Sequence, residues 1–171
     1  MDMKSSIKYI KKLKEISKDE DNNIIVCNCE NFFLNFDELK NVKKYKKRPS
    51  SPDMLFINNN KKEIWFVEFK SSDFRNLEKE RFKIKRKILD GLIVFYEIYQ
   101  NYFDYKKFYF VVYNKANSYE NEVVNSIGEE KTIEFGLEEL IGKFLEDVFT
   151  ENCEIFKEKF KERFDIEFEC K

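Results

Sequence analysis

The chain of 171 residues contains no histidine. Its absence excludes Ser-His-Asp and Cys-His catalysis, nucleases that use a histidine ligand, and zinc sites built on imidazole. Any acid–base or metal chemistry must therefore come from carboxylates, lysine, tyrosine, cysteine or backbone oxygens.

Glycine, proline and cysteine are scarce, with four, two and four copies. So few Gly and Pro residues argue against long flexible linkers. The cysteines form one C-x-C (Cys27 and Cys29) and two distant singles (Cys153 and Cys170). Because four-thiolate zinc sites usually show paired spacing, we expect ordinary reduced cysteines instead.

Apolar runs long enough for a signal peptide or a membrane span are also missing. We therefore expect a cytoplasmic protein without a membrane partner. The net charge is only −1, but it is unevenly distributed. Residues 1–52 hold 12 Lys/Arg against 8 Asp/Glu, residues 53–107 hold 12 against 9, and residues 108–171 hold 8 against 16. The basic part suggests a polyanionic partner, although a solvated Lys/Glu-rich surface explains the charges equally well.

The length favours a single domain, 1–171. Hydrophobic periodicity predicts helices at 4–17, 30–40, 74–102, 116–127, 136–149 and 151–164. It also predicts strands at 24–27, 53–58, 63–70, 107–113 and 131–135, and an edge strand at 164–170. Because several strands are apolar on both faces, each face needs a covering layer. The fold class is therefore α/β (α+β), a central mixed sheet flanked by helices.

The stretch "SPDMLFINNNKKEIWFVEFKSS" (51–72) reads as a hairpin with a turn at 60–61 or 59–62. Both turns pair residues whose numbers sum to 121, so Asp53 faces Glu68. Lys70 lies two positions beyond Glu68 and therefore projects from the same face. The turn thus predicts two carboxylates and an ammonium at one end of an otherwise apolar hairpin.

Two facing carboxylates repel each other unless a cation lies between them. Mg²⁺ or Mn²⁺ would resolve the conflict, and the backbone carbonyl of Phe69 would add a third oxygen ligand. Lys70 could then orient an attacking water or stabilise charge on a phosphate. The alternative is a buried salt bridge of Lys70 with Glu68 and Asp53.

Pro52-Asp53, followed after fourteen residues by Glu68-Phe69-Lys70, resembles the signature of the PD-(D/E)xK nucleases. The resemblance covers roughly 5–113, a restriction-endonuclease-like αβββαβ core, and leaves 114–171 as an acidic C-terminal extension packed on it. It implies Mg²⁺-dependent phosphodiester hydrolysis, with Asp53 and Glu68 as metal ligands and Lys70 as the catalytic lysine. It also implies a further acid near the first helix, for which Glu30 is a better candidate than the solvent-facing Glu15.

Basic side chains flank the motif and could bind the phosphates of DNA or RNA. The candidates are Lys46, Lys47 and Arg48 in the loop before Asp53, and Lys83, Arg86 and Lys87 in the following helix. Tyr45 could stack on a base. For each of these lysines, an exposed position on a solvated surface is an equally good interpretation.

Two other functions remain open. One is a catalytically inactive nuclease-fold module that binds nucleic acid or a protein partner. The other is an unrelated α/β protein in which the charges form a structural ion pair. If the chain is a nuclease, a homodimer would allow it to cut both strands of a duplex at once.

Overall fold

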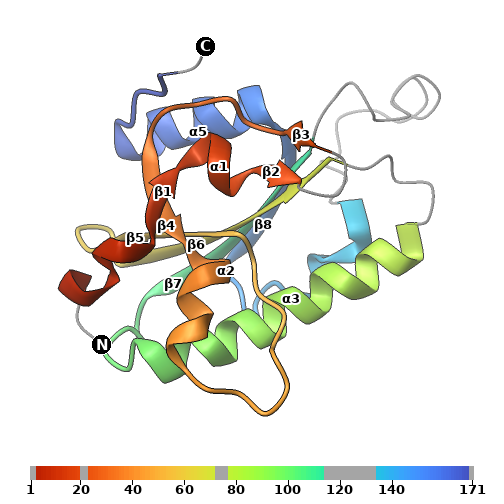
Figure 1. Ribbon diagram of the computed structural model, residues 1–171. Helices are drawn as coiled ribbons and strands as arrows, with labels where there is room; N and C mark the ends of the chain where they lie inside the picture. Colours follow the sequence, from red (N-terminus) through yellow and green to blue (C-terminus); the bar gives the residue numbers. More distant parts are fainter. Residues whose placement is uncertain (1–2, 20–22, 72–76, 114–133, 170–171) are drawn as a thin grey trace.

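The computed structural model describes residues 3–19, 23–71, 77–113 and 134–169 (Figure 1). Its centre is a six-stranded mixed sheet with strand order β1–β4–β5–β6–β7–β8. Strands β1, β4, β5 and β6 are antiparallel neighbours, whereas β6, β7 and β8 are parallel. The strands span Ile10–Lys12 (β1), Phe32–Asn35 (β4), Met54–Asn58 (β5), Glu63–Lys70 (β6), Lys106–Tyr113 (β7) and Asp147–Asn152 (β8). Among the described residues, β2 (Lys18–Asp19) and β3 (Ile24–Ile25) form a separate two-stranded sheet.

Helices cover both faces of the sheet, as the apolar strands require (Figure 1). The long helix α3 (Leu77–Ile98) runs along one face, together with α2 (Phe36–Leu39). Helices α1 (Leu13–Ile16) and α5 (Cys153–Phe164) cover the other face. The 3₁₀ helices are η1 (Met3–Tyr9), η2 (Lys40–Val42), η4 (Glu134–Gly136) and η5 (Glu138–Leu140). The expected mixed α/β architecture is confirmed.

Strand β6 shows how the sequence builds the two cores. All of its residues except Lys70 are buried. Ile64 and Phe66 pack with α3, whereas Trp65, Val67 and Phe69 pack with α1 and α5. Alternation along one strand therefore supplies both layers, and it determines the face on which each charged residue lies.

The N-terminal expectations need correction. The helix predicted over 4–17 is divided into η1, β1 and α1, because β1 pairs Ile10 with Leu34 at the edge of the sheet. The helix predicted over 30–40 begins as strand β4 and becomes helical only at α2. Asn35 caps α2 by accepting a hydrogen bond from the Glu38 amide at 2.9 Å. Apolar residues at helical spacing therefore also fit a strand followed by a turn of helix.

The helix predicted over 136–149 is also wrong, because this segment forms η5 and then β8, which pairs in parallel with β7. Residues 165–169 form no strand. Their backbone instead bonds to residues 30–31, for example Glu30 N–H to the Glu169 carbonyl at 2.8 Å. The expected strand over 131–135 is absent from its described part, which begins η4. The helix expected over 116–127 lies outside the described residues.

The expectation of reduced cysteines is wrong as well. A disulfide joins Cys27 to Cys153, with their Cα atoms 5.8 Å apart. It links the segment after β3 to the first residue of α5, within the apolar layer on that face of the sheet. Disulfides persist mainly in oxidising compartments. The bond therefore gives no support to the expected cytoplasmic location, which stays a prediction. In the described ranges, no helix combines the length and apolarity needed to cross a bilayer.

Candidate active site

The hairpin register is the one that the turn predicts. Leu55 pairs with Phe66 and Ile57 with Ile64, so paired numbers sum to 121. Asp53 lies just before β5, and its N–H donates to the Val67 carbonyl at 3.0 Å. Its carboxylate accepts a hydrogen bond from the Phe69 amide at 2.7 Å. Asp53 is therefore attached at two points to the end of β6 that carries Glu68 and Lys70.

Helix α3 lies directly against Pro52, the residue before Asp53. A Cβ atom added at Gly91 would lie 2.6 Å from Pro52 Cδ, closer than real contacts allow. One residue earlier on the same helix, the Asp90 carboxylate accepts a hydrogen bond from the Ser50 amide at 2.9 Å. The glycine thus permits the close approach that holds the loop before Asp53 on the helix.

The carboxylates of Asp53 and Glu68 converge on one cation, the ammonium of Lys87. Lys87 Nζ lies 2.7 and 2.8 Å from the two Glu68 oxygens and 3.5 Å from Asp53 Oδ1. Lys87 is one of the residues that the sequence analysis assigns to nucleic-acid binding. The structure places it inside the site instead, with only 26% of its side chain exposed.

Lys70 joins the same cluster from the strand. Its Nζ lies 3.2 Å from Glu68 Oε1 and 3.1 Å from Glu80 Oε2, and the other Glu80 oxygen binds Lys83 at 2.6 Å. Sequence reasoning missed Glu80 and the position of Lys87. The signal was present, because seven residues are close to two helical turns and place both side chains on one face of α3.

Burial and mutual repulsion shape the electrostatics of the cluster. Burial, together with the charge of Glu68, raises the pKa of the Asp53 carboxyl well above its usual range, although Lys87 opposes this. Burial would lower the pKa of Lys87, but the charges of Glu68 and Asp53 outweigh it and raise that pKa. The same balance, with Glu68 and Glu80 as the acids, raises the pKa of Lys70. Both lysines are therefore firmly charged.

Asp37 of α2 is a further acid on this side of the molecule, which sequence reasoning also missed. Its carboxylate binds the ammonium of Lys40 and, at 2.8 Å, the Ser51 hydroxyl. Arg48 lies 3.5 Å away. Asp37 and Lys87 interact electrostatically, each favouring the charged form of the other. The negative charge around Lys87 therefore comes from α2 as well as from the hairpin.

Glu30, the acid expected to join the site, lies elsewhere. It pairs with Lys14 at 2.5 Å and Lys12 at 2.8 Å, next to β1 and β4. Hydrogen bonds from these two lysines hold the pKa of Glu30 down at about 2. This partner set fits a structural ion pair better than a ligand of the ion expected between Asp53 and Glu68.

The donor atoms of the cluster fit a hard divalent ion. Asp53 and Glu68 offer carboxylate oxygens. The Phe69 carbonyl points to the same side of β6 as the Phe69 N–H, which bonds to Asp53. Across the described ranges, no three or more Asp, Glu, Cys or His side chains group as a metal site. Two carboxylates and one carbonyl are therefore the ligands that this part of the chain would provide.

A buried hydroxyl beside the carboxylates supports a hydrated or ion-binding site. Tyr109 of β7 lies on the same face as Phe66 and Glu68, since it pairs with Phe66. Its hydroxyl is fully buried and makes no hydrogen bond to any described residue. Burial and the charges of Glu68 and Asp53 raise the pKa of Tyr109 well above its usual range. A water or a hydrated ion between these groups would supply the missing partner.

The other predicted phosphate contacts lie on the surface around the site. Lys46, Lys47 and Arg48 are exposed in the loop before β5. Lys83 and Arg86 are exposed on α3, where Arg86 lies 3.4 Å from Asp90. Tyr45 does not fit the expected role in base stacking, because it packs against the core and its hydroxyl donates to Glu97 at 2.7 Å.

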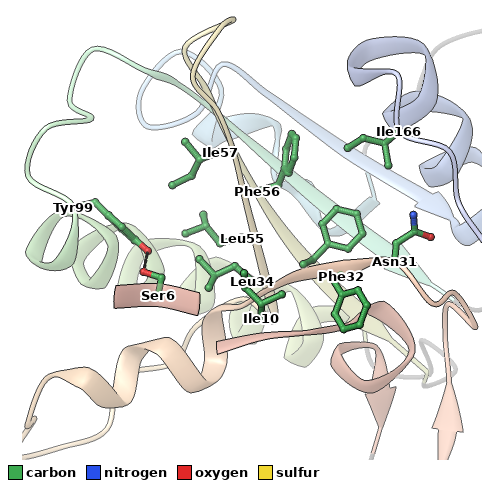
Figure 2. Close-up of a pocket in the computed structure, with 11 residues that line it drawn as sticks. Ser6, Ile10, Asn31, Phe32, Leu34, Leu55, Phe56, Ile57, Tyr99 and Ile166 are labelled. Atoms are coloured by element: carbon green, nitrogen blue, oxygen red, sulfur yellow. Dashed lines mark hydrogen bonds between the residues drawn. The ribbon is translucent and has the colours of Figure 1, made fainter. Parts of the chain in front are cut away.

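A separate apolar pocket of about 410 Å³ opens beyond the other half of β5 (Figure 2). It forms because β4 pairs with β5 only at Leu34 and Asn35, so the two strands separate after that point. Phe32, Phe56 and Ile57 line it, and a hydrogen bond of 2.7 Å between Ser6 and Tyr99 lies at one side (Figure 2). No charged side chain of the described chain lines this pocket. The described lining of the pocket therefore offers no carboxylate or amine for acid–base or metal chemistry.

Comparison with protein-family models, curated proteins and solved structures finds no match to this chain.

Proposed function

We propose that this protein is a metal-dependent nuclease that hydrolyses phosphodiester bonds of DNA or RNA. The observation that carries the proposal is the convergence of Asp53 and Glu68 on a single cationic position. Lys87 Nζ lies 2.7 Å from Glu68 Oε1 and 3.5 Å from Asp53 Oδ1, so one ion can contact both acids. Lys70 adjoins this point from the same strand as Glu68, as the proposed chemistry requires.

The order of elements also supports a restriction-endonuclease-like core. A helical N-terminal segment precedes the antiparallel strands β4, β5 and β6, and α3 then crosses to β7, which is parallel to β6. Apart from β1, the β2–β3 pair and the short helix α2, this order is consistent with the αβββαβ core that the sequence resemblance implies. The charged cluster lies where β5 begins and β6 ends, beside α3.

The chemistry of each residue determines the role that we propose for it. Asp53, Glu68 and the Phe69 carbonyl would hold Mg²⁺ or Mn²⁺, which supplies the Lewis acidity that activates water and neutralises a phosphate. Lys70, held by Glu80, would orient the attacking water or stabilise the charge that develops on phosphorus oxygens. Water adds to phosphorus, the bond to the leaving oxygen breaks, and that oxygen receives a proton.

The exposed basic residues would hold the substrate. Lys46, Lys47 and Arg48 come from the loop that ends at Asp53, and Lys83 and Arg86 from the helix that carries Lys87. Contacts of this type bind the phosphate backbone without reading sequence. Binding should therefore weaken steeply with salt for DNA and RNA alike.

A second candidate is a nuclease-fold module that binds nucleic acid without cutting it. One observation favours it: within the described residues, both lysines and all three acids of the cluster already have ionic partners. A cluster that neutralises itself does not need a metal for stability. Catalysis is the property that separates the two candidates.

The test is a cleavage assay on single- and double-stranded DNA and RNA, with Mg²⁺, Mn²⁺ or EDTA. We expect cleavage that requires metal and falls at least about a hundredfold in Asp53→Ala and Lys70→Ala. Asp104→Ala is the matched control, because Asp104 is an exposed acid that pairs with Lys62 beside the hairpin turn. It should cut like the wild type.

Equal cleavage by the Asp53 and Lys70 variants would refute the proposal, as would the absence of cleavage under every condition. In the second case, salt-sensitive binding to the same nucleic acids would support the inactive module. Absence of both cleavage and binding would favour a structural ion-pair cluster.

A further inference from the structure

Lys87 has the contacts of a bound cation rather than those of a surface lysine. Its ammonium contacts both oxygens of Glu68, at 2.7 and 2.8 Å, and reaches Asp53 Oδ1 at 3.5 Å. The Glu68 side chain is 1% exposed, so solvent contributes little to neutralising it. The lysine therefore supplies the positive charge that the two facing carboxylates need.

The same carboxylate oxygens are the ligands that the proposed function gives to a divalent ion. An ammonium and a divalent ion repel each other, and Mg²⁺ approaches its oxygen ligands to about 2.0–2.1 Å. Both cannot occupy the position between Asp53 and Glu68 with their full set of contacts. The lysine and the metal must therefore compete for these oxygens.

The two lysines of the cluster differ in how firmly they are held. Lys70 is 14% exposed and bonds to Glu80 as well as Glu68, and Glu80 is itself fixed by Lys83. Lys87 is more exposed, at 26%, and it forms its ion pairs with the two proposed metal ligands, Asp53 and Glu68. Its flexible four-carbon stem can move without the helix, and Asp37 of α2 offers a nearby negative charge. Lys87 is therefore the lysine that can leave.

We propose that Lys87 is a resident counter-ion that occupies the metal position in the metal-free protein and must be displaced for Mg²⁺ or Mn²⁺ to bind. This inference rests on the proposed function, since it concerns the same carboxylates. It makes Lys87 a regulator of metal affinity: it keeps the pair of acids folded together without metal, and it weakens the binding of the ion. The assignment differs from nucleic-acid binding, for which Lys87 would have to point to solvent.

The first test is calorimetric titration of Mn²⁺ into the wild type and Lys87→Met, without nucleic acid. Met keeps most of the length of the side chain but removes the competing charge, so Mn²⁺ should bind at least about tenfold more tightly. Lys85→Met is the matched control, because Lys85 lies on the same helix, is 21% exposed and pairs with Glu139 outside the site. Its Mn²⁺ affinity should stay within about twofold of the wild type.

Unchanged or weaker Mn²⁺ binding by folded Lys87→Met would overturn the inference. If the variant shows no such gain but the wild type binds Mn²⁺ and cleaves in the assay above, the proposed function stands and only this inference fails. If neither protein binds Mn²⁺ and no cleavage occurs, both fail. Mn²⁺ binding seen only in Lys87→Met would support the displacement directly.

A second measurement uses the wild type alone and therefore does not depend on the folding of a Lys87 variant. In NMR spectra of lysine-labelled wild type, Mg²⁺ should shift the terminal Cε and Nζ signals of Lys87, because the ammonium leaves Glu68. The signals of Lys85 should stay in place. Signals of Lys87 that do not move at saturating Mg²⁺ would show that lysine and metal do not compete.

Discussion

Strand β6 carries a buried glutamate at each end, and the two ends solve the problem of a buried charge differently. Glu63 faces α5 and Glu68 faces α3, and both are almost completely buried. At the first end, Arg163 makes two hydrogen bonds to the Glu63 carboxylate, at 2.8 and 2.9 Å. The Trp65 indole N–H adds a third at 3.1 Å. One acid thus meets one planar cation in fixed geometry.

The Glu68 end contains more charges than a structural pair needs. A second carboxylate, Asp53, faces the same ammonium, and two lysines share Glu68. Lysine is a point charge on a flexible stem, so it fixes geometry less firmly than arginine. The Tyr109 hydroxyl close to these acids makes no hydrogen bond in the described part of the chain. A closed, fully bonded pair thus indicates a structural role, whereas facing like charges and an unsatisfied hydroxyl indicate a functional site.

The largest expected difference between the ends is in catalysis. Glu68→Gln should lower metal-dependent cleavage at least about a hundredfold, because it removes a charged ligand. Glu63→Gln, the same substitution at the other end of β6, should leave the rate per folded molecule unchanged. Initial rates, normalised to folded protein by circular dichroism, measure both. Similar losses in the two variants would mean that Glu68 has no special role.

The Glu68 site shows how far the sequence leads. The turn determines the register by counting alone, so the pairing of Met54 with Val67, which brings Asp53 to the end of β6, follows from the sequence before any tertiary contact is known. The positions of Lys87 and Glu80 do not follow, because the rotation of α3 relative to the sheet depends on its contact with Pro52 at Gly91. A helical period shows which residues share a face but does not identify what that face contacts.

The fold was predictable to a similar extent. Strands with local partners, β5 and β6, were predicted correctly, as were the long helix and β7. The sequence predicts a helix in place of β8, because the apolar residues of this segment recur at helical spacing: Leu137, Leu140, Ile141, Leu145 and Val148. Val148 instead pairs with Tyr109, thirty-nine positions earlier in the chain. Parallel pairing between distant segments leaves no local signal of this kind.

The next largest effect concerns the stability of the structural end. Arg163→Met should lower the free energy of unfolding by about 2 kcal/mol, because Glu63 would remain buried with one neutral partner. This is less than for a fully buried pair, since 38% of the Arg163 side chain is exposed. Urea unfolding measures it. Arg86→Met, which breaks the exposed pair with Asp90, is the control and should change stability by less than about 0.5 kcal/mol. Equal effects of the two variants would contradict the assignment of Glu63 as structural.

Tyr109→Phe tests the unsatisfied hydroxyl at the other end. The variant should raise the free energy of unfolding of the metal-free protein by about 1 kcal/mol, because it removes a buried polar atom that has no partner. Tyr99→Phe is the matched control. Tyr99 is similarly buried, but its hydroxyl forms a hydrogen bond with Ser6 at 2.7 Å. Removing that hydroxyl should therefore lower the free energy of unfolding by about 1 kcal/mol. Destabilisation by Tyr109→Phe would show instead that an ordered water in the site forms a hydrogen bond with this hydroxyl.

The smallest expected effect is the pH dependence of the structural end. Burial alone would raise the pKa of Glu63, but hydrogen bonds from Arg163 and Trp65 outweigh it and hold that pKa below its ordinary value of 4.5. The unfolded chain therefore takes up the proton first. The stabilisation from Glu63 is complete above about pH 4.5 and is lost as the pH falls through the lower, folded-state pKa.

Because Arg163 is partly exposed, this contribution should be below about 1 kcal/mol. It is measured as the difference in unfolding free energy between the wild type and Glu63→Gln, followed from pH 7 to pH 3. The difference should shrink toward acid pH, since the glutamine cannot titrate. A difference that stays constant or grows would mean that Arg163 does not stabilise the charged form of Glu63. The contrast between the two ends of β6 would then need a different physical basis.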